Sequence, residues 1–149
     1  MGLSATLYIT DSYDAVEMYK KAFGMTLGYH LSYEDVDGMK AWGLTVDDDY
    51  IPYKGYFHAD LKSDRGLAFS VSGELDNSKE NTEKLKSFGF YQQPIELYVN
   101  LGCVEAVKRA FDVLKEGGRV QSEPRFNAIG DCSACVIDRN NIWWAIVAN

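Results

Sequence analysis

The sequence lacks a long apolar run, and none approaches the roughly 20 residues needed to span a bilayer. It also lacks a basic cluster, because 15 lysines and arginines are outnumbered by 22 aspartates and glutamates, leaving a net charge of -7. Such a surface repels phosphate backbones. We therefore expect no contact with a membrane and no nucleic-acid partner.

Cysteine is scarce and odd in number, with three residues in a chain of 149. That set fits a reducing compartment better than a disulfide framework. The opening MGLSATLYIT has no basic stretch followed by an apolar core, so we expect no secretory signal and predict a cytoplasmic protein. The composition, 46% hydrophobic and 25% charged, is typical of a globular chain.

What the sequence does contain is an internal repeat. LYITDSYDAVEMYKKAF, from Leu7, is echoed by LYVNLGCVEAVKRAF, from Leu97. In each copy, alternation predicts a strand and apolar residues three and four apart then predict a helix. The helix-facing strand residues are Leu7, Ile9, Leu97 and Val99, and those of the other face are Thr6, Tyr8, Glu96 and Tyr98.

The expected helices have their own start and stop signals. Asp11 or Ser12 is a suitable N-cap for the first helix, and Gly24 permits the left-handed conformation that ends it. Gly117 and Gly118 end the second helix in the same way. The predicted buried stripes are Val16, Tyr19 and Phe23 in the first helix, and Val104, Val107, Phe111 and Leu114 in the second.

The repeat extends to a hairpin in each half. Residues 57–72 align without a gap on residues 132–147, and both read as strand, polar turn and strand. One more strand fits before each hairpin, at 27–33 and at 119–124. Each half is therefore predicted to be a βαβββ module, and the fold class is α+β. A unit of this size rarely buries its sheet face alone, so we expect the two sheets to join around a hollow.

The module boundaries follow from this pattern. We place the first module at 1–73, a connector at 74–90 and the second module at 91–149, all within one structural domain. The polar run from Glu74 to Lys86 is expected to form a short exposed helix, and residues 34–56 an excursion near a pocket mouth. Within that excursion, Met39 to Val46 is expected to add a strand.

Two modules of this kind resemble the vicinal oxygen chelate superfamily, which includes glyoxalase I, extradiol dioxygenases, and fosfomycin and bleomycin resistance proteins, and in particular its PhnB-like branch. The residues that carry the resemblance are Asp14-Ala15-Val16, Phe57-His58-Ala59-Asp60-Leu61, and the C-terminal run with Gly117-Gly118, Asp138 and Trp144. The resemblance implies the glyoxalase/bleomycin resistance/dioxygenase fold, a curved mixed-sheet cup often completed by a second subunit. A homodimer is therefore expected.

The resemblance also implies where a metal would be held. Metal-using members take His or Glu ligands from the first and last strands of each module, and here these slots hold Ser4 or Thr6, Ser70, Pro94 or Glu96, and Ala145. A divalent ion needs three or four converging N, O or S ligands. Only Glu96 is a suitable donor, so no metal and no other cofactor is expected. The fallback metal set is His58, Asp60 and Glu96.

Two further motifs have less specific interpretations. His58 either makes an ordinary hydrogen bond or acts as a general base beside a carboxylate, and with Glu96 it is the best catalytic candidate. The C-x-x-C spacing of Cys132 and Cys135 falls within a predicted strand, so its sulfurs point to opposite faces and burial explains them better than redox chemistry. VDDDY, 46–50, is expected to be a solvated loop or a weak cation site.

The aromatic residues are the main binding signal. Tyr8, Tyr56, Tyr98 and Trp143 are predicted to share the face away from the helices, with Trp42 nearby. They line either a small-molecule pocket or a subunit contact.

The predicted function is the binding of a small organic molecule, without the usual metal, in an aromatic cup. The predicted ligand-binding residues are Tyr8, Tyr56, His58, Glu96, Tyr98 and Trp143. The alternative is a metal-dependent lyase, isomerase or dioxygenase that uses an atypical site of His58 and Glu96. The net charge favours a cationic ligand.

Overall fold

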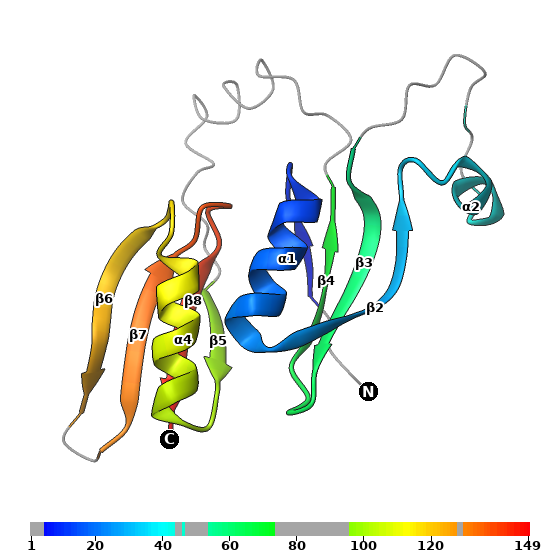
Figure 1. The fold of residues 1–149 in the computed structure, drawn as a ribbon. Coiled ribbons are helices and arrows are strands. Elements are labelled where there is room, and N and C mark those ends of the chain that lie inside the picture. Colours follow the sequence, from blue (N-terminus) through cyan, green and yellow to red (C-terminus); the bar gives the residue numbers. More distant parts are fainter. Residues whose placement is uncertain (1–4, 44–45, 47–53, 74–95, 128–129) are drawn as a thin grey trace. The chain divides into compact units, whose positions relative to one another are not determined.

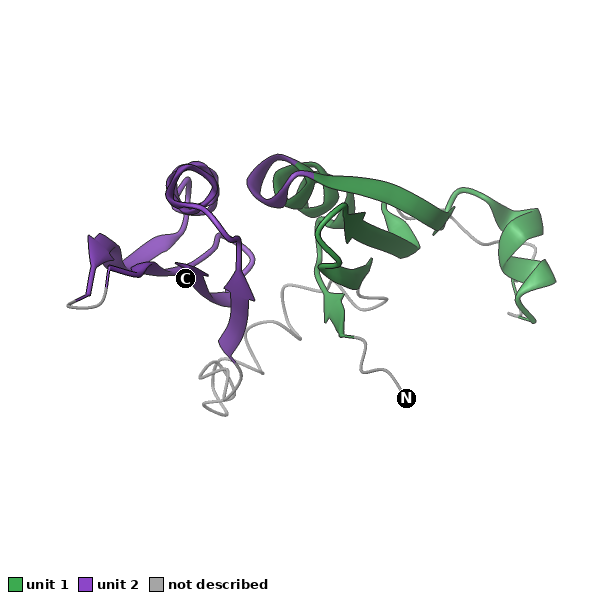
Figure 2. Cartoon of the chain, turned by 90° about the horizontal axis from the view of Figure 1, so that it is seen from below, with its two compact units in different colours: residues 1–20, 25–75 green, residues 21–24, 76–149 purple. Residues whose placement is uncertain are grey.

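A computed structural model of the chain describes residues 5–43, 46, 54–73, 96–127 and 130–149 (Figure 1). The chain separates into two compact units, residues 1–20 with 25–75 and residues 21–24 with 76–149 (Figure 2). The predicted connector, its expected short helix, and VDDDY beyond Val46 lie outside the described residues. Within the described ranges, no helix combines the length and apolar character that a bilayer crossing requires.

The first unit is a four-stranded mixed sheet with helix α1 on one face (Figure 1). Its elements are β1 (Thr6–Tyr8), α1 (Ser12–Phe23), β2 (Met25–Ser32), α2 (Val36–Ala41), β3 (Tyr56–Ser63) and β4 (Ala68–Ser72). The strand order is β1-β4-β3-β2, with β1 parallel to β4 and the other neighbours antiparallel.

The second unit repeats this topology. Its elements are β5 (Glu96–Asn100), α4 (Val104–Leu114), β6 (Arg119–Phe126), β7 (Cys132–Ile137) and β8 (Trp143–Ala148). The strand order is β5-β8-β7-β6, again with the first strand parallel to the last of the unit. The predicted α+β class and the βαβββ pattern of both halves are confirmed.

The helix-facing side of each sheet is built as the alternation predicts. In β1, Leu7 is buried while Tyr8 is 66% exposed, and in β5, Val99 is buried while Tyr98 is 63% exposed. In α1, Val16 and Tyr19 are fully buried. The Tyr19 ring meets Phe69 of β4 edge-on at 5.4 Å between centroids.

The helix ends also agree with the sequence. The Asp11 carboxylate accepts a hydrogen bond from the backbone N–H of Asp14, which caps the first turn of α1. Gly24 follows α1 with φ +63°, and Gly117 follows α4 with φ +72°. Both glycines adopt the left-handed conformation that side chains resist. In α4, Val107, Phe111 and Leu114 are buried as predicted.

One predicted strand is wrong. Met39, expected at the start of an added strand from Met39 to Val46, lies instead in the helix α2. Asp35 caps α2 by accepting a hydrogen bond from the backbone N–H of Gly38 at 2.9 Å. The helix places Met39 in a buried cluster with Leu31 and Tyr33. The local cap and this apolar contact outweigh the strand-like alternation of the segment.

The sequence similarity aligns Leu7 with Leu97, but the strand pairing in the structure differs from that alignment by two residues. Thr6 pairs with Ser70, whereas Tyr98 pairs with Ala145, the residue that corresponds to Ser70 in the hairpin alignment. Leu7 is therefore matched in space by Val99 rather than by Leu97. A shift of two residues leaves every side chain on its predicted face, so the face assignment is unaffected.

Candidate functional site: an aromatic pocket on the first sheet

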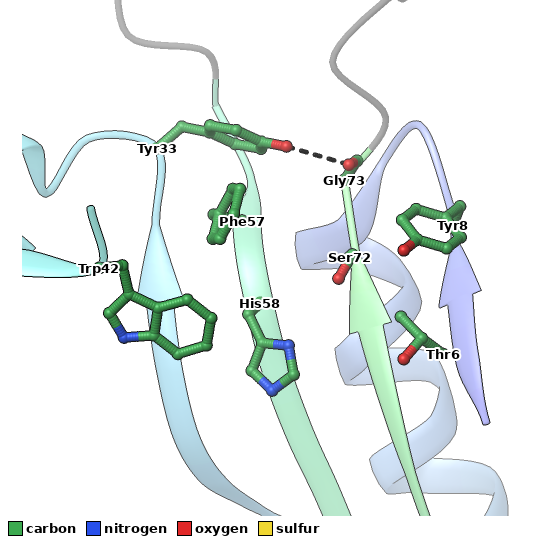
Figure 3. Close-up of a pocket in the computed structure, with 8 residues that line it drawn as sticks. All are labelled: Thr6, Tyr8, Tyr33, Trp42, Phe57, His58, Ser72 and Gly73. Carbon is green, nitrogen blue, oxygen red and sulfur yellow. Dashed lines mark hydrogen bonds between the residues drawn. The ribbon is translucent and has the colours of Figure 1, made fainter. Parts of the chain in front are cut away.

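A cavity of about 600 Å³ lies on the face of the first sheet opposite α1 (Figure 3). Aromatic rings and small polar groups line it, a combination typical of small-molecule sites. The lining residues are Thr6, Tyr8, Tyr33, Trp42, Phe57, His58, Ser72 and Gly73. All of them belong to the first unit.

A β-bulge in β3 sets which side chains reach this cavity. His58 pairs with Leu31 and Tyr56 with Ser32, so Phe57 is an extra residue on its strand. A bulge of this kind brings two successive side chains to one face, and here Phe57 and His58 both line the cavity.

The bulge also explains why one predicted residue is misplaced. The ring of Tyr56 packs edge-on against Tyr13 of α1, with 4.6 Å between centroids. Its side chain thus lies on the helix side of the sheet, so the prediction that it shares a face with Tyr8 is wrong. Alternation along the strand is interrupted at the bulge, one residue before His58.

Trp42 forms one wall of the cavity directly after α2. Its indole stacks on Tyr29, with 5.8 Å between centroids and 7° between planes, and its Nε1 donates a hydrogen bond to the Tyr29 hydroxyl at 2.6 Å. Phe57 meets it edge-on at 5.9 Å. These contacts hold the indole in place before any ligand arrives, which lowers the ordering cost of binding.

Tyr33 and Gly73 close the end of the cavity. The Tyr33 ring is 1% exposed, and its hydroxyl donates to the Gly73 carbonyl at 3.0 Å (Figure 3). A Cβ on Gly73 would lie 2.9 Å from Tyr33 Cε2 and 3.0 Å from the carbonyl oxygen of Tyr56. The close approach of these segments therefore requires glycine at this position.

His58 belongs to a polar trio, defined here as His58, Asp60 and Ser70. His58 Nε2 lies 2.8 Å from Asp60 Oδ1, and the Ser70 hydroxyl donates to the same oxygen at 2.8 Å. Burial alone raises the pKa of the Asp60 carboxyl. The hydrogen bonds from Ser70 and His58 and the charge of the imidazole outweigh burial and lower that pKa below its ordinary value.

The described residues at the expected metal slots, Thr6, Ser70, Glu96 and Ala145, supply one carboxylate and no histidine. The Ser70 hydroxyl is a donor to Asp60, Ala145 offers no ligand atom, and Ser4 and Pro94 lie outside the described residues. Across the parts of the chain that the structure describes, no group of three or more His, Cys, Asp or Glu side chains is arranged to hold a metal. The structure brings His58 and Asp60 together, whereas Glu96 belongs to the other unit.

The remaining predicted site residues lie in the second unit. Glu96 and Trp143, partners across β5 and β8, line a smaller cavity of about 240 Å³ on that sheet, with Arg125 and Cys135 among its other residues. Tyr98 is exposed on the same strand as Glu96. A single cup that combines these residues with Tyr8 and His58 stays a prediction.

The C-x-x-C pair lies in a strand, as expected. Cys132 is buried and Cys135 half-buried in β7, and neither forms a disulfide. His30, the second histidine, is exposed on β2.

The sequence missed Tyr33, Phe57, Ser72 and Gly73 as pocket residues. Phe57 follows from the bulge, for which the sequence carries no clear signal. Gly73, at the end of a predicted strand, was the available hint of a close backbone approach.

Comparison with known proteins assigns the fold. No family model matches the chain, and no curated protein matches its sequence. A Bacillus cereus structure described as a putative 3-demethylubiquinone-9 3-methyltransferase, PhnB protein, is similar over 100% of both chains, with a TM-score of 0.69 and 13% identity. A glyoxalase/bleomycin resistance protein/dioxygenase family enzyme from Burkholderia phytofirmans PsJN is similar over 97% of this chain and 95% of its own, with a TM-score of 0.54 and 11% identity.

A glyoxalase-related enzyme from Fulvimarina pelagi is also similar, over 100% of this chain and 88% of its own, with a TM-score of 0.57 and 14% identity. Identities this low carry the architecture and not the reaction. The chain has the glyoxalase/bleomycin resistance/dioxygenase fold.

Proposed function

We propose that the chain binds a small organic molecule in the aromatic pocket of its first unit and that this binding needs no metal ion. The observation that carries the proposal is the cavity of about 600 Å³ whose walls are aromatic and whose polar groups are few. Drug-sized ligands occupy cavities of about 300–1,000 Å³ with this kind of lining.

The net charge of the chain and the aromatic rings of the site favour a flat or cationic ligand. The net charge of -7 attracts cations to the surface. The indole of Trp42 is held by the stacked ring of Tyr29 and is half exposed, so its exposed part is available for stacking or for a cation–π contact.

The proposal keeps Glu96, Tyr98 and Trp143 of the second unit as further candidate ligand-binding residues. The proposed working form is a homodimer in the cytoplasm. The exposed rings of Tyr8 and Tyr98 support an aromatic contact, with a ligand or with a second subunit.

The test is a thermal-shift screen of cationic and aromatic small molecules, followed by calorimetric titration of each hit. Trp42→Ala is expected to raise the Kd by about tenfold, because an aromatic contact contributes about 1 kcal/mol beyond its buried area. Phe126→Ala is the matched control, since Phe126 is an exposed ring on β6 outside the lining of this cavity. Hits that bind Trp42→Ala as well as the parent protein would disprove the pocket.

A second variant asks whether the second unit takes part. Tyr98→Ala is expected to weaken the same hits, and Tyr8→Ala to weaken them more, because Tyr8 lines the cavity directly. If Tyr98→Ala leaves every Kd unchanged, the ligand lies on the first unit alone and the shared cup is wrong.

Elemental analysis and titration with Zn, Ni, Mn and Fe separate this proposal from the enzymatic alternative. We expect no stoichiometric binding. Stoichiometric binding that is lost in His58→Ala and in Glu96→Ala would instead favour the metal-dependent lyase, isomerase or dioxygenase.

A further inference from the structure

The two histidines of the chain contact their partners through different ring nitrogens. His58 uses Nε2, which lies 2.8 Å from Asp60 Oδ1, whereas His30 uses Nδ1, which lies 3.1 Å from the backbone carbonyl of Gly28. An ionised carboxylate and a carbonyl oxygen only accept hydrogen bonds. The ring nitrogen that faces each of them must therefore carry the proton.

Ser70 strengthens this assignment for His58. Its hydroxyl already donates to Asp60 Oδ1, so that oxygen receives two donors, an arrangement suited to an ionised carboxylate. The neutral imidazole of His58 is consequently the tautomer with Nε2 protonated and an unprotonated Nδ1. Neutral His30 is the other tautomer.

The unprotonated nitrogen of His58 faces the pocket. Figure 3 shows the imidazole with Nδ1 turned toward the side of Thr6 and Ser72. Trp42 lies on the opposite side of the imidazole in Figure 3, at 5.7 Å between centroids, and the Tyr29 ring lies 6.3 Å from it. Among the described residues, Nδ1 has no hydrogen-bond partner, so its lone pair is available to a ligand.

We infer that His58 is the hydrogen-bond acceptor of the pocket, and that the ligand is an aromatic molecule that presents an N–H or O–H donor, such as a primary ammonium or a phenolic hydroxyl. Asp60 and Ser70 act as positioning residues because they fix the tautomer without touching the ligand. Carboxylates are disfavoured, since their oxygens would meet the lone pair of Nδ1. This inference rests on the proposed function of the pocket and specifies its ligand class.

The tautomers are tested first, without any ligand. Two-bond proton–nitrogen NMR of the histidine side chains, at about pH 9 where ordinary imidazoles are neutral, separates the two forms. We expect the Nε2–H form for His58 and the Nδ1–H form for His30, with the signals assigned through His30→Gln. A proton on Nδ1 of His58 would overturn the inference.

The ligand class is tested with three probes that share one ring: phenol, anisole and benzoate. Phenol is expected to bind about tenfold more tightly than anisole, which cannot donate to Nδ1, because a ligand that removes water from this acceptor without pairing with it loses affinity. Tenfold corresponds to about 1.4 kcal/mol. Benzoate is expected to bind more weakly than anisole. In His58→Phe the phenol preference should disappear, whereas His30→Phe should keep it.

The outcomes distinguish this inference from the function on which it rests. Equal Kd values for phenol and anisole, both weakened by Trp42→Ala, would overturn the donor requirement and leave the aromatic pocket standing. If none of the three probes binds, the proposed function of the aromatic pocket is wrong, and the inference about its ligand class is wrong with it.

Discussion

The hairpins of the two repeats match on one face and differ on the other. Asp60 pairs with Ser70 in the first hairpin, and at the matching positions of the second hairpin Cys135 pairs with Ala145. The second repeat thus has a thiol and a methyl where the first has a carboxylate and a hydroxyl.

The helix-facing side shows no such divergence. Leu61 and Phe69 pair in the first hairpin, Val136 and Trp144 in the second, and all four are buried. Burial demands apolar residues of suitable volume on this side, while the open side is free to carry chemistry. The two repeats therefore share the fold, whereas the carboxylate and hydroxyl of the polar trio are present in the first repeat and absent from the matching positions of the second.

The largest effects should come from the matched core rings. Trp144→Ala and Phe69→Ala are each expected to lower the free energy of unfolding by about 3–5 kcal/mol. Trp144→Phe keeps a ring but removes the Nε1 donor, which lies 2.9 Å from the buried Asp138 carboxylate, and should cost about 1–3 kcal/mol. Urea unfolding followed by circular dichroism measures all three. If Trp144→Phe left the free energy of unfolding unchanged, the hydrogen bond to Asp138 would contribute nothing to stability.

Smaller effects are expected at the glycines that follow the helices. In Gly118→Ala the new methyl would meet the carbonyl oxygen of Ile137 and lie 2.9 Å from that of Leu114, and such overpacking costs about 3 kcal/mol. Gly24 has nothing within 4 Å of an added Cβ, but its φ of +63° makes alanine cost about 1–2 kcal/mol. Urea unfolding ranks the two variants by their loss of unfolding free energy. A larger loss for Gly24→Ala than for Gly118→Ala would mean that backbone strain at positive φ outweighs steric overlap.

The smallest effect should be the pH dependence of the polar trio. The pKa of Asp60 is lowered in the folded state from its ordinary 3.8, so its stabilising contribution is complete above that value and is lost as pH falls through the folded pKa. The stability difference between the parent protein and Asp60→Asn should therefore shrink on acidification below about pH 4.

Controls tie this pH effect to the trio. Ser70→Ala removes one of the hydrogen bonds that lower the pKa of Asp60, so it should reduce the acid-dependent loss. Cys135→Ser, at the matching position of the second repeat, should change stability by an amount that is constant across the same pH range. A parallel pH response in Cys135→Ser would mean that the trio is not the source.

Much of the fold could be predicted from the sequence because burial on one face leaves a periodic record. Val16, Tyr19 and Leu7 were assigned to the core from spacing alone, and the structure confirms them. The site was only partly predictable. At the bulge in β3, Tyr56 lies on the helix side of the sheet and Phe57 lines the cavity, the reverse of what strict alternation from His58 predicts. Sequence alternation alone cannot reveal such a one-residue shift.

The sequence by itself determined the duplicated βαβββ plan, since hydrophobic period, caps and glycines act over a few residues and are legible locally. Only the tertiary structure decided which side chains meet on the open face: Trp42 against Tyr29, and His58 against Asp60 and Ser70. These contacts depend on strand register, on the bulge in β3 and on the position of Trp42 at the end of α2. Each of these is fixed by contacts between distant residues, which no single stretch of sequence encodes.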